Sequence, residues 1–300
     1  MANSNETVIK CTAGQSIGGS HVVAVKIGNK GFANPSSGSI SFTYEVSVSG
    51  IKPTRGSMGG GTFVTVSGSG FSVTPNDSSV TIGDSICEIV NTTMTEISCF
   101  TTSHDTSNAS VNVTVGGEVG SMLDSFMYDS GKTPVVSSLS TSEGGVSGGE
   151  QLMIHGTGFG SQQGTVKIGP HLCEVTLYSD VLIKCTTPAN APGIYDVLVC
   201  VDGIGCAVEA GLRPRPPQFK YILYVSGISP EYGSVLGGTV VTLVGRGFSD
   251  NTSAVAVNVG DVPCKVLSSR NIDIMCRMES SSTVHNVDNT GIHPGNTLDF

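Results

Sequence analysis

Long apolar runs and helical periodicity are both missing from this 300-residue sequence. No stretch places apolar residues at helical spacing over ten or more positions, which excludes helices longer than a single turn. No apolar run approaches the length that crosses a bilayer. Forty glycines and thirteen prolines instead interrupt short alternating runs, a pattern that predicts an all-β protein.

Positive charge is also scarce. The chain carries 15 lysines and arginines against 24 aspartates and glutamates, a formal net charge of −9, so a nucleic-acid duplex would be repelled. The one basic patch, Arg213 to Arg215 with Lys220, is too small for the several phosphate contacts that specific binding requires. We interpret it as a proline-stiffened edge segment kept soluble by arginine, with a glycan or phosphate site as the alternative.

Motifs for catalysis, cofactors or metals are absent as well. The Gly-x-Gly-Phe runs resemble part of a dinucleotide fingerprint, but each lies between strands and lacks the helix whose N-terminus would hold a phosphate. Loops such as Ser249 to Asn251 could bind calcium weakly, but the dense ligand spacing of dedicated calcium sites is missing. The sequence therefore predicts no enzyme, no cofactor and no catalytic or metal-binding residues.

What the sequence does contain is an internal repeat. A glycine doublet, a short apolar strand and a Gly-x-Gly-Phe run occur three times, ending at Phe71, Phe159 and Phe248. The interval of about 90 residues is the size of one immunoglobulin-like sandwich, so each copy can fold as a domain. Within a copy the apolar residues alternate, as at Val111 to Val115 and Val197 to Val201, which places one strand face in a core and the other in water.

The repeat sets the expected domain boundaries. Repeat 1 spans residues 49–132, repeat 2 spans 133–224 and repeat 3 spans 225–300. Residues 1–48, the N-terminal segment, are expected to be the C-terminal half of a further domain, because Glu6 to Cys11 reproduces the strand that carries the second cysteine of the later copies. A displaced Pro-Gly motif makes us expect repeat 3 to be incomplete at its C-terminal end. We expect the chain to be a piece of a longer protein that supplies a leader and an anchor.

Nine cysteines fit the repeat. In each copy an alternating strand ends in a cysteine, a second cysteine follows twelve positions later, and one further pair flanks a short turn in repeat 2. Zinc binding is disfavoured because neither a Cys-x-x-Cys motif nor a histidine recurs beside these pairs. We predict disulfides, with about 3 kcal/mol of stabilisation from each twelve-residue bridge, and an oxidising, extracellular compartment. The predicted bridges are Cys87 to Cys99, Cys173 to Cys185, Cys200 to Cys206 and Cys264 to Cys276, with Cys11 left as a free thiol.

Six Asn-x-Ser/Thr acceptors agree with that compartment. Four of them fall in repeat 1 and none in repeat 2. Because glycans are bulky and hydrated, repeat 2 should offer the largest bare protein face, and our hypothesis is that a partner binds there. The predicted glycosylation sites are Asn5, Asn76, Asn91, Asn108, Asn112 and Asn251.

One further feature concerns the junction between repeats 1 and 2, and another concerns the Cys200–Cys206 bridge. Thirteen positions separate Phe126 from Leu139 of the repeat 2 opening motif, against nine from Phe42 to Ile51 at the preceding junction. The longer linker and the missing opening proline should loosen this junction. Cys200 alternates with the apolar valines of its strand. The Cys200–Cys206 bridge should therefore lie on the outer face of a hairpin, outside the core of repeat 2, and act as an accessory staple.

The remaining motifs point to a family. They are an Ile-x-Pro-x-x-Gly opening (Ile51 to Gly56 and Ile228 to Gly233), a Gly-Gly-Thr strand, Gly-x-Gly-Phe and the two cysteines; the opening of repeat 2 departs, with Leu139, Thr141 and Gly144. Together they resemble the IPT/TIG domain over nearly the whole chain. The resemblance implies an all-β fold class of tandem immunoglobulin-like β-sandwich (IPT/TIG) domains, each disulfide-stapled.

The resemblance also implies a setting. IPT/TIG domains occur in plexins, hepatocyte-growth-factor-type receptors, Rel-type transcription factors and fibrocystin ectodomains, and the acidic charge of this chain disfavours the DNA-binding branch. Head-to-tail copies with paired cysteines and no intervening module are most similar to a fibrocystin or fibrocystin-like ectodomain. Plexin-like arrays are the alternative.

The expected function is that of a non-enzymatic extracellular segment of a large cell-surface protein, in the ectodomain of a single-pass plasma-membrane protein. It would act as a structural and adhesive spacer and as part of a surface-coat array. The alternative is a ligand-binding receptor module of plexin or growth-factor-receptor type, and an accessory domain of a secreted hydrolase is disfavoured. Expected partners are a protein or a glycan at the cell surface, or neighbouring copies of the chain. No nucleic acid is expected, and a membrane only through an anchor outside these residues.

Overall fold

The computed structural model describes residues 3–4, 8–35, 38–105, 107–161, 164–211 and 214–280. Its regular structure is strand, interrupted by the short 3₁₀ turns η1 (Gly28–Lys30), η2 (Pro75–Asp77) and η3 (Thr252–Ala254). The all-β prediction is therefore confirmed. The chain forms two compact units, of which the first holds Met1–Ser142, Gly149–Pro188 and Ile194–Phe219, and the second holds Glu143–Gly148, Ala189–Gly193 and Lys220–Phe300.

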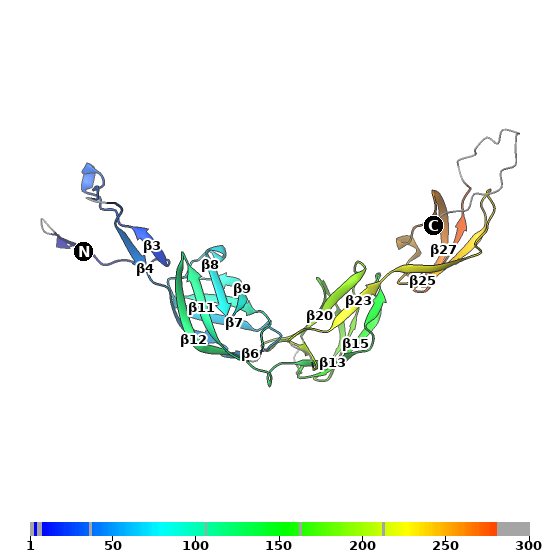
Figure 1. The fold of residues 1–300 in the computed structure, drawn as a ribbon, viewed down its shortest axis with the longest axis horizontal. Helices are drawn as coiled ribbons and strands as arrows, with labels where there is room; N and C mark the ends of the chain where they lie inside the picture. The colour runs from blue at the N-terminus through cyan, green and yellow to red at the C-terminus, as the bar shows by residue number, and fades with distance from the viewer. Residues whose placement is uncertain are drawn as a thin grey trace. The chain divides into compact units, whose positions relative to one another are not determined.

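Repeat 1 is a sandwich of two mainly antiparallel sheets (Figure 1). One sheet has the order β5 (Ser47–Lys52), β7 (Phe63–Ser69), β10 (Glu96–Thr101) and β9 (Ser85–Thr92). The other has the order β8 (Ser78–Ile82), β11 (Ser107–Val115), β12 (Glu118–Tyr128) and β6 (Arg55–Gly56), with β6 parallel to β12. The β8–β9 hairpin connects the two sheets.

The core of repeat 1 lies between these sheets. Val64 and Val66 of β7 face it, as do the alternating valines of β11, and the large rings of Phe126 and Tyr128 fill it. The intervening side chains of β7 and β11 are exposed or half-buried. This alternation confirms that the period of two marks strands with one buried face.

The Gly-x-Gly-Phe run has the same role in every repeat. A Cβ atom added to Gly68 would collide with the ring of Phe71, which is fully buried. The same contact recurs between Gly156 and Phe159 and between Gly245 and Phe248. The first glycine of the run therefore lets the strand backbone lie against a core phenylalanine.

Repeat 2 has the same two-layer plan. Its first sheet has the order β18 (Glu174–Tyr178), β19 (Leu182–Thr186), β15 (Gln151–Thr157), β13 (Val135–Leu139) and β22 (Val208–Glu209). Its second contains β23 (Gln218–Ile222), β20 (Gly193–Val201), β16 (Thr165–Ile168) and β17 (His171–Leu172), and the short β21 (Gly205–Cys206) pairs with β20. Within the second unit, β14 (Glu143–Gly145) pairs in parallel with the end of β23 at Lys220 to Ile222.

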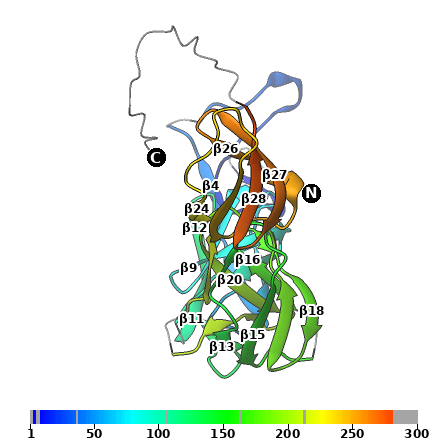
Figure 2. The ribbon, with the colours of Figure 1, turned by 90° about the vertical axis from the view of Figure 1, so that its right-hand side faces the viewer.

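Repeat 3 is described to residue 280 and forms one antiparallel sheet. The strand order is β24 (Tyr224–Ser229), β25 (Val240–Arg246), β28 (Asp273–Met278), β27 (Val262–Arg270) and β26 (Val257–Val259). Figure 2 shows β26, β27 and β28 side by side. The rest of the predicted repeat, residues 281–300, lies outside the described residues.

The N-terminal segment contains two strand pairs, β1 (Asn3–Ser4) with β2 (Ile9–Lys10) and β3 (Gly19–Val22) with β4 (Ser41–Tyr44). Its alternation at Val23 and Ile27 predicts a buried strand face, but both side chains are about half exposed, at 48% and 53%. Among the described residues no second sheet covers them, which explains the difference. That this segment is half of an IPT/TIG domain stays a prediction.

Candidate functional site

Four disulfides staple the repeats. In repeat 1 the bridge joins Cys87 of β9 to Cys99 of the neighbouring β10, and both cysteines are buried on the core side of the sheet. Repeats 2 and 3 carry the equivalent bridges Cys173–Cys185 and Cys264–Cys276, also buried. Burial protects these bonds, because a reductant in solution reaches them only when a repeat opens.

Cys11 is a free and exposed cysteine, one residue beyond β2. The other eight cysteines are paired in the structure. A thiol with this exposure is accessible to oxidants and to a second thiol.

The sequons of repeat 1 lie on both sheets and on a connecting turn. Asn76 is exposed in η2 and Asn91 is exposed on β9. Asn108 and Asn112 point away from the core on β11, but Asn112 is only half-buried and donates a hydrogen bond to Thr81 Oγ1 at 3.4 Å. Asn108 is the more open acceptor of these two.

The two remaining sequons lie outside repeat 1. Asn251 of repeat 3 is exposed and caps η3, where its side-chain oxygen accepts a hydrogen bond from Ser253 N. Asn5 lies outside the described residues. Occupancy of all six sequons stays a prediction.

Repeat 2 carries no sequon and presents a mixed protein surface. Leu172, Val181 and Ile194 are more than half exposed, at 63%, 55% and 63%. Of the basic patch, Arg215 and Lys220 are exposed, whereas Arg213 lies outside the described residues. Repeat 2 thus exposes both apolar and positively charged side chains.

The hairpin that carries the fourth disulfide packs on repeat 1, within the first unit. Cys200 points away from the core valines of β20, as predicted. Cys206 is nevertheless only 8% exposed, because Ser57 to Gly61 of repeat 1 cover it. The bridge is thus outside the core of its own repeat but buried in a contact between repeats.

Three hydrogen bonds join this hairpin to repeat 1. Cys206 N donates to Gly60 O at 2.7 Å, and Ser57 Oγ donates to Cys206 O. Thr62 Oγ1 donates to Ile204 O at 2.7 Å. Ser57 and Thr62 are almost completely buried. A buried polar group that loses its hydrogen-bond partner destabilises the folded state. These bonds therefore hold the hairpin and the glycine doublet together.

The longer linker between the two repeats also makes contacts. Thr133 Oγ1 donates to Asp129 O at 2.8 Å and accepts a hydrogen bond from Met58 N at 2.9 Å. The carboxylate of Asp129 forms an ion pair with the Arg55 guanidinium at 3.2 Å, and it accepts a hydrogen bond from Gly131 N. These contacts fold the linker residues into a turn bound to repeat 1. The loose junction, which we predict from the longer linker and the missing opening proline, stays a prediction.

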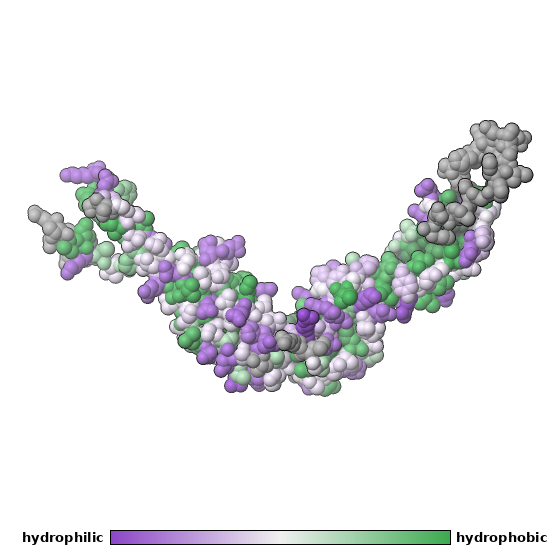
Figure 3. Space-filling model, in the orientation of Figure 1, coloured by the Kyte–Doolittle hydropathy of each residue, from purple (hydrophilic) through white to green (hydrophobic). Residues whose placement is uncertain are grey.

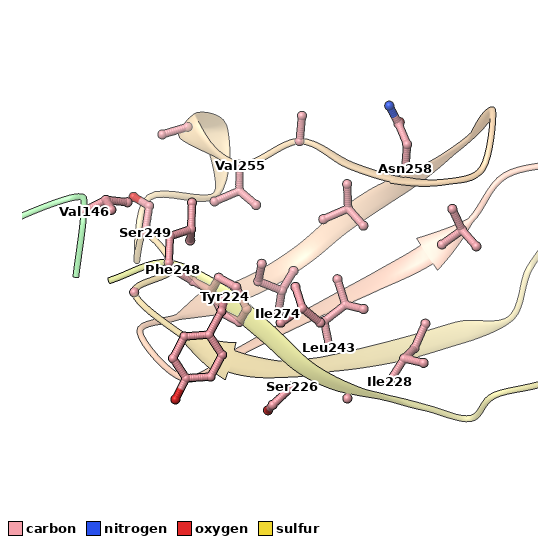
Figure 4. A pocket seen from close by; sticks show the side chains of 18 of the residues that line it. Val146, Tyr224, Ser226, Ile228, Leu243, Phe248, Ser249, Val255, Asn258 and Ile274 are labelled. Carbon is pink, nitrogen blue, oxygen red and sulfur yellow. The ribbon is translucent and has the colours of Figure 1, made fainter. Parts of the chain in front are cut away.

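Repeat 3 contains a groove of about 1110 Å³ (Figure 4). Leu243, Phe248, Val255, Val257 and Ile274 line it with other apolar side chains. In Figure 3 hydrophobic residues, in green, gather on the described part of this repeat.

The groove coincides with core positions of the repeat. Leu243, Phe248 and Ile274 correspond to Val66, Phe71 and Ile97, counted from the glycine doublets and second cysteines. All three equivalents are fully buried in the core of repeat 1. We therefore attribute the groove to the core face of a sandwich rather than to a ligand pocket.

In the part of the chain that the structure describes, no group of three or more histidine, cysteine or acidic side chains is arranged to hold a metal ion. Burial raises the pKa of Tyr128 to about 12, and its ring stacks on His104 at 4.8 Å between ring centroids. Among the described helical segments, none is long and apolar enough to cross a membrane.

Comparison with known proteins agrees with the repeat. A family model for the IPT/TIG domain matches residues 47–128, 134–221 and 223–296. Fibrocystin-L of Mus musculus is 34% identical over 291 residues, which cover 96% of this chain and 7% of that protein. Fibrocystin of Canis lupus familiaris is 28% identical over 285 residues, covering 91% of this chain and 7% of that protein.

A solved structure, the full extracellular region of plexin A4, is 22% identical and covers 79% of this chain and 21% of that chain, with a TM-score of 0.31. The chain spans about 7% of the length of the fibrocystin relatives that it matches. Three family matches in tandem cover most of the sequence. The chain therefore belongs to the IPT/TIG domain family.

Proposed function

We propose that this chain is a non-enzymatic extracellular segment of a larger cell-surface protein, in which the repeats form a structural and adhesive spacer. The observation that carries the proposal is the stapling of each repeat by its own buried disulfide. Such bonds persist in oxidising compartments outside the cell and are rare in the cytosol. They keep a domain folded where chaperones do not act.

The exposed sequons support the same compartment. Asn76, Asn91, Asn108 and Asn251 are accessible on folded repeats, so attached glycans would not disturb the cores. A glycosylated string of small sandwiches would keep other molecules away from a membrane and contribute to a surface coat. The anchor to a plasma membrane, through a single span, would lie in another part of the protein.

Adhesion in this proposal uses repeat 2. It is free of sequons and exposes apolar side chains together with Arg215 and Lys220. A protein or a sulfated glycan of the cell surface fits this combination, and so does a neighbouring copy of the net acidic chain, because opposite charges steer association.

A single change tests the surface of repeat 2 around β18. Glu174 and Thr176 are both exposed on β18, so Glu174→Asn creates an Asn-Val-Thr sequon on repeat 2. Glu174→Gln removes the same charge without adding a sequon and is the matched control. Beads coated with the secreted chain, and cells offered the chain, should bind less with Glu174→Asn than with Glu174→Gln. Equal binding, with the new glycan verified by mass, would remove this face of repeat 2 from the proposal.

The alternative is a ligand-binding receptor module of plexin or growth-factor-receptor type. The same bare face of repeat 2 favours it, because a defined ligand also needs accessible protein surface. Binding of one soluble protein with nanomolar affinity, abolished by Glu174→Asn, would favour the receptor function over the adhesive one.

A further inference from the structure

An exposed aromatic pair lies on the outer face of repeat 1. Phe63 of β7 and Phe100 of β10 are directly opposite in the sheet, with ring centroids 5.2 Å apart. They are 46% and 41% exposed, and Val90 on the neighbouring β9 is 55% exposed. Exposed apolar clusters of this kind favour unwanted association unless something covers them.

The other repeats do not have this pair. At the same register, repeat 2 places Gln151 opposite Thr186, and repeat 3 places Val240 opposite Arg277. The aromatic pair is therefore not required by the fold of the sheet. A feature specific to repeat 1 must account for it.

The sheet register supplies that feature. Asn91 of β9 lies opposite Ser98 of β10, and Ser98 lies opposite Thr65 of β7. Phe100 is two residues beyond Ser98, so it is on the same face of the sheet. It is diagonal to Asn91 across the register shift between Ser98 and Cys99. The short side chains of Ser98 and Thr65 thus form the surface next to Asn91. The rings of Phe100 and Phe63 form the next pair on the same face.

Sequon and aromatic pair occur together only in this repeat. In repeat 2 the position of Asn91 is taken by Leu177, which lies opposite Lys184, the equivalent of Ser98. In repeat 3 it is taken by Ser268, which lies opposite Met275. Neither is an asparagine, and neither sheet carries two phenylalanines at the next register position.

We propose that an N-linked glycan on Asn91 lies across the outer face of repeat 1 and covers Phe63 and Phe100. Its first N-acetylglucosamine would pack the apolar face of the sugar ring on the phenylalanine rings, which removes apolar area from water. The inference rests on the proposed extracellular function, since the sequon is used only in the secretory pathway. It makes this glycan part of the folded surface of repeat 1.

The test compares release of individual glycans from the secreted full chain. Cells that yield high-mannose glycans would express the wild type and the double variant Phe63→Gln with Phe100→Thr, which copies the polar pair of repeat 2. Endoglycosidase H release would be followed at Asn91 and, as an internal control, at Asn76. We expect the double variant to lose the Asn91 glycan at least threefold faster, with no change at Asn76.

A second readout detects the patch directly. The dye 1-anilinonaphthalene-8-sulfonate should bind more strongly after Asn91→Gln than after Asn76→Gln, and the double phenylalanine change should abolish that difference. An intact Cys87–Cys99 bridge by mass would show that the variants fold. Equal release rates with unchanged dye binding would overturn the inference, as would an unoccupied Asn91 beside occupied Asn76 and Asn251. A chain with no occupied sequon at all would instead overturn the proposed function.

Discussion

The contact between the Cys200–Cys206 hairpin and repeat 1 predicts the effect of adding a single methyl group at Gly59. A Cβ atom at this position would collide with the backbone of Cys206 and lie within 3.1 Å of Ala207 O. Both neighbours belong to repeat 2, so Gly59→Ala leaves repeat 1 undisturbed and separates the hairpin from it. Gly50→Ala is the matched control, because a Cβ there meets no atom within 4 Å.

The magnitude follows from the hydrogen bonds that the displaced hairpin would lose. Three cross the contact: Cys206 N to Gly60 O, Ser57 Oγ to Cys206 O and Thr62 Oγ1 to Ile204 O. Each contributes about 1 kcal/mol net. Loss of one to three of them should raise the opening equilibrium of the contact by about 5-fold to about 150-fold.

Hydrogen exchange measures that opening. The Cys206 amide is the donor of one of the three bonds, so mass spectrometry of the peptide that contains it reports on the contact. We expect exchange to accelerate within the range above in Gly59→Ala and to stay at the wild-type rate in Gly50→Ala. Wild-type protection of Cys206 in Gly59→Ala would refute the packing of the hairpin on repeat 1.

Two further predictions concern stability. The Tyr128 hydroxyl is buried without a hydrogen-bond partner among the described residues, and its pKa of about 12 exceeds the ordinary value of about 10. The unfolded state therefore binds fewer protons between these values. The contribution of Tyr128 to stability should be constant below pH 10 and fall by up to about 1.4 kcal/mol per pH unit as pH rises toward 12. Urea unfolding at pH 9 and 11 should show a smaller fall for Tyr128→Phe, and an equal fall would contradict the assignment. Replacing Cys200 and Cys206 by serine should lower the melting temperature less than removing the twelve-residue bridge of the same repeat, because the shorter loop constrains the unfolded chain less; an equal or larger drop would contradict this.

The sequence predicts the layers of each repeat well because local signals and the fold agree. The alternating valines of β11 and the contact of Gly68 with the Phe71 ring both lie inside one repeat. There, strand parity decides which side chains are buried, and the space beside the backbone decides where glycine is required. The period of two at Val23 and Ile27 carries the same signal, yet these side chains are exposed. Alternation identifies a strand face, and only a second sheet buries it.

Contacts between distant segments were not predictable in the same way. The parity of Cys200 indicates that it points out of its own core, but not that Gly59 of another repeat covers its bridge. Likewise Phe63 and Phe100 are far apart in sequence, and a bulge near Ser98 shifts the register that places Asn91 diagonal to Phe100. Such placements depend on strand pairing and bulges, which no single-sequence pattern specifies.

Non-reducing peptide mapping of the chain secreted from mammalian cells tests whether each repeat of an extracellular chain is stapled by its own disulfide. We predict the bonds Cys87–Cys99, Cys173–Cys185, Cys200–Cys206 and Cys264–Cys276, with Cys11 the only free or intermolecularly bonded thiol. The same digest should show glycans on the exposed sequons. A different connectivity, or free thiol at any of the eight paired cysteines, would contradict the predicted bonds.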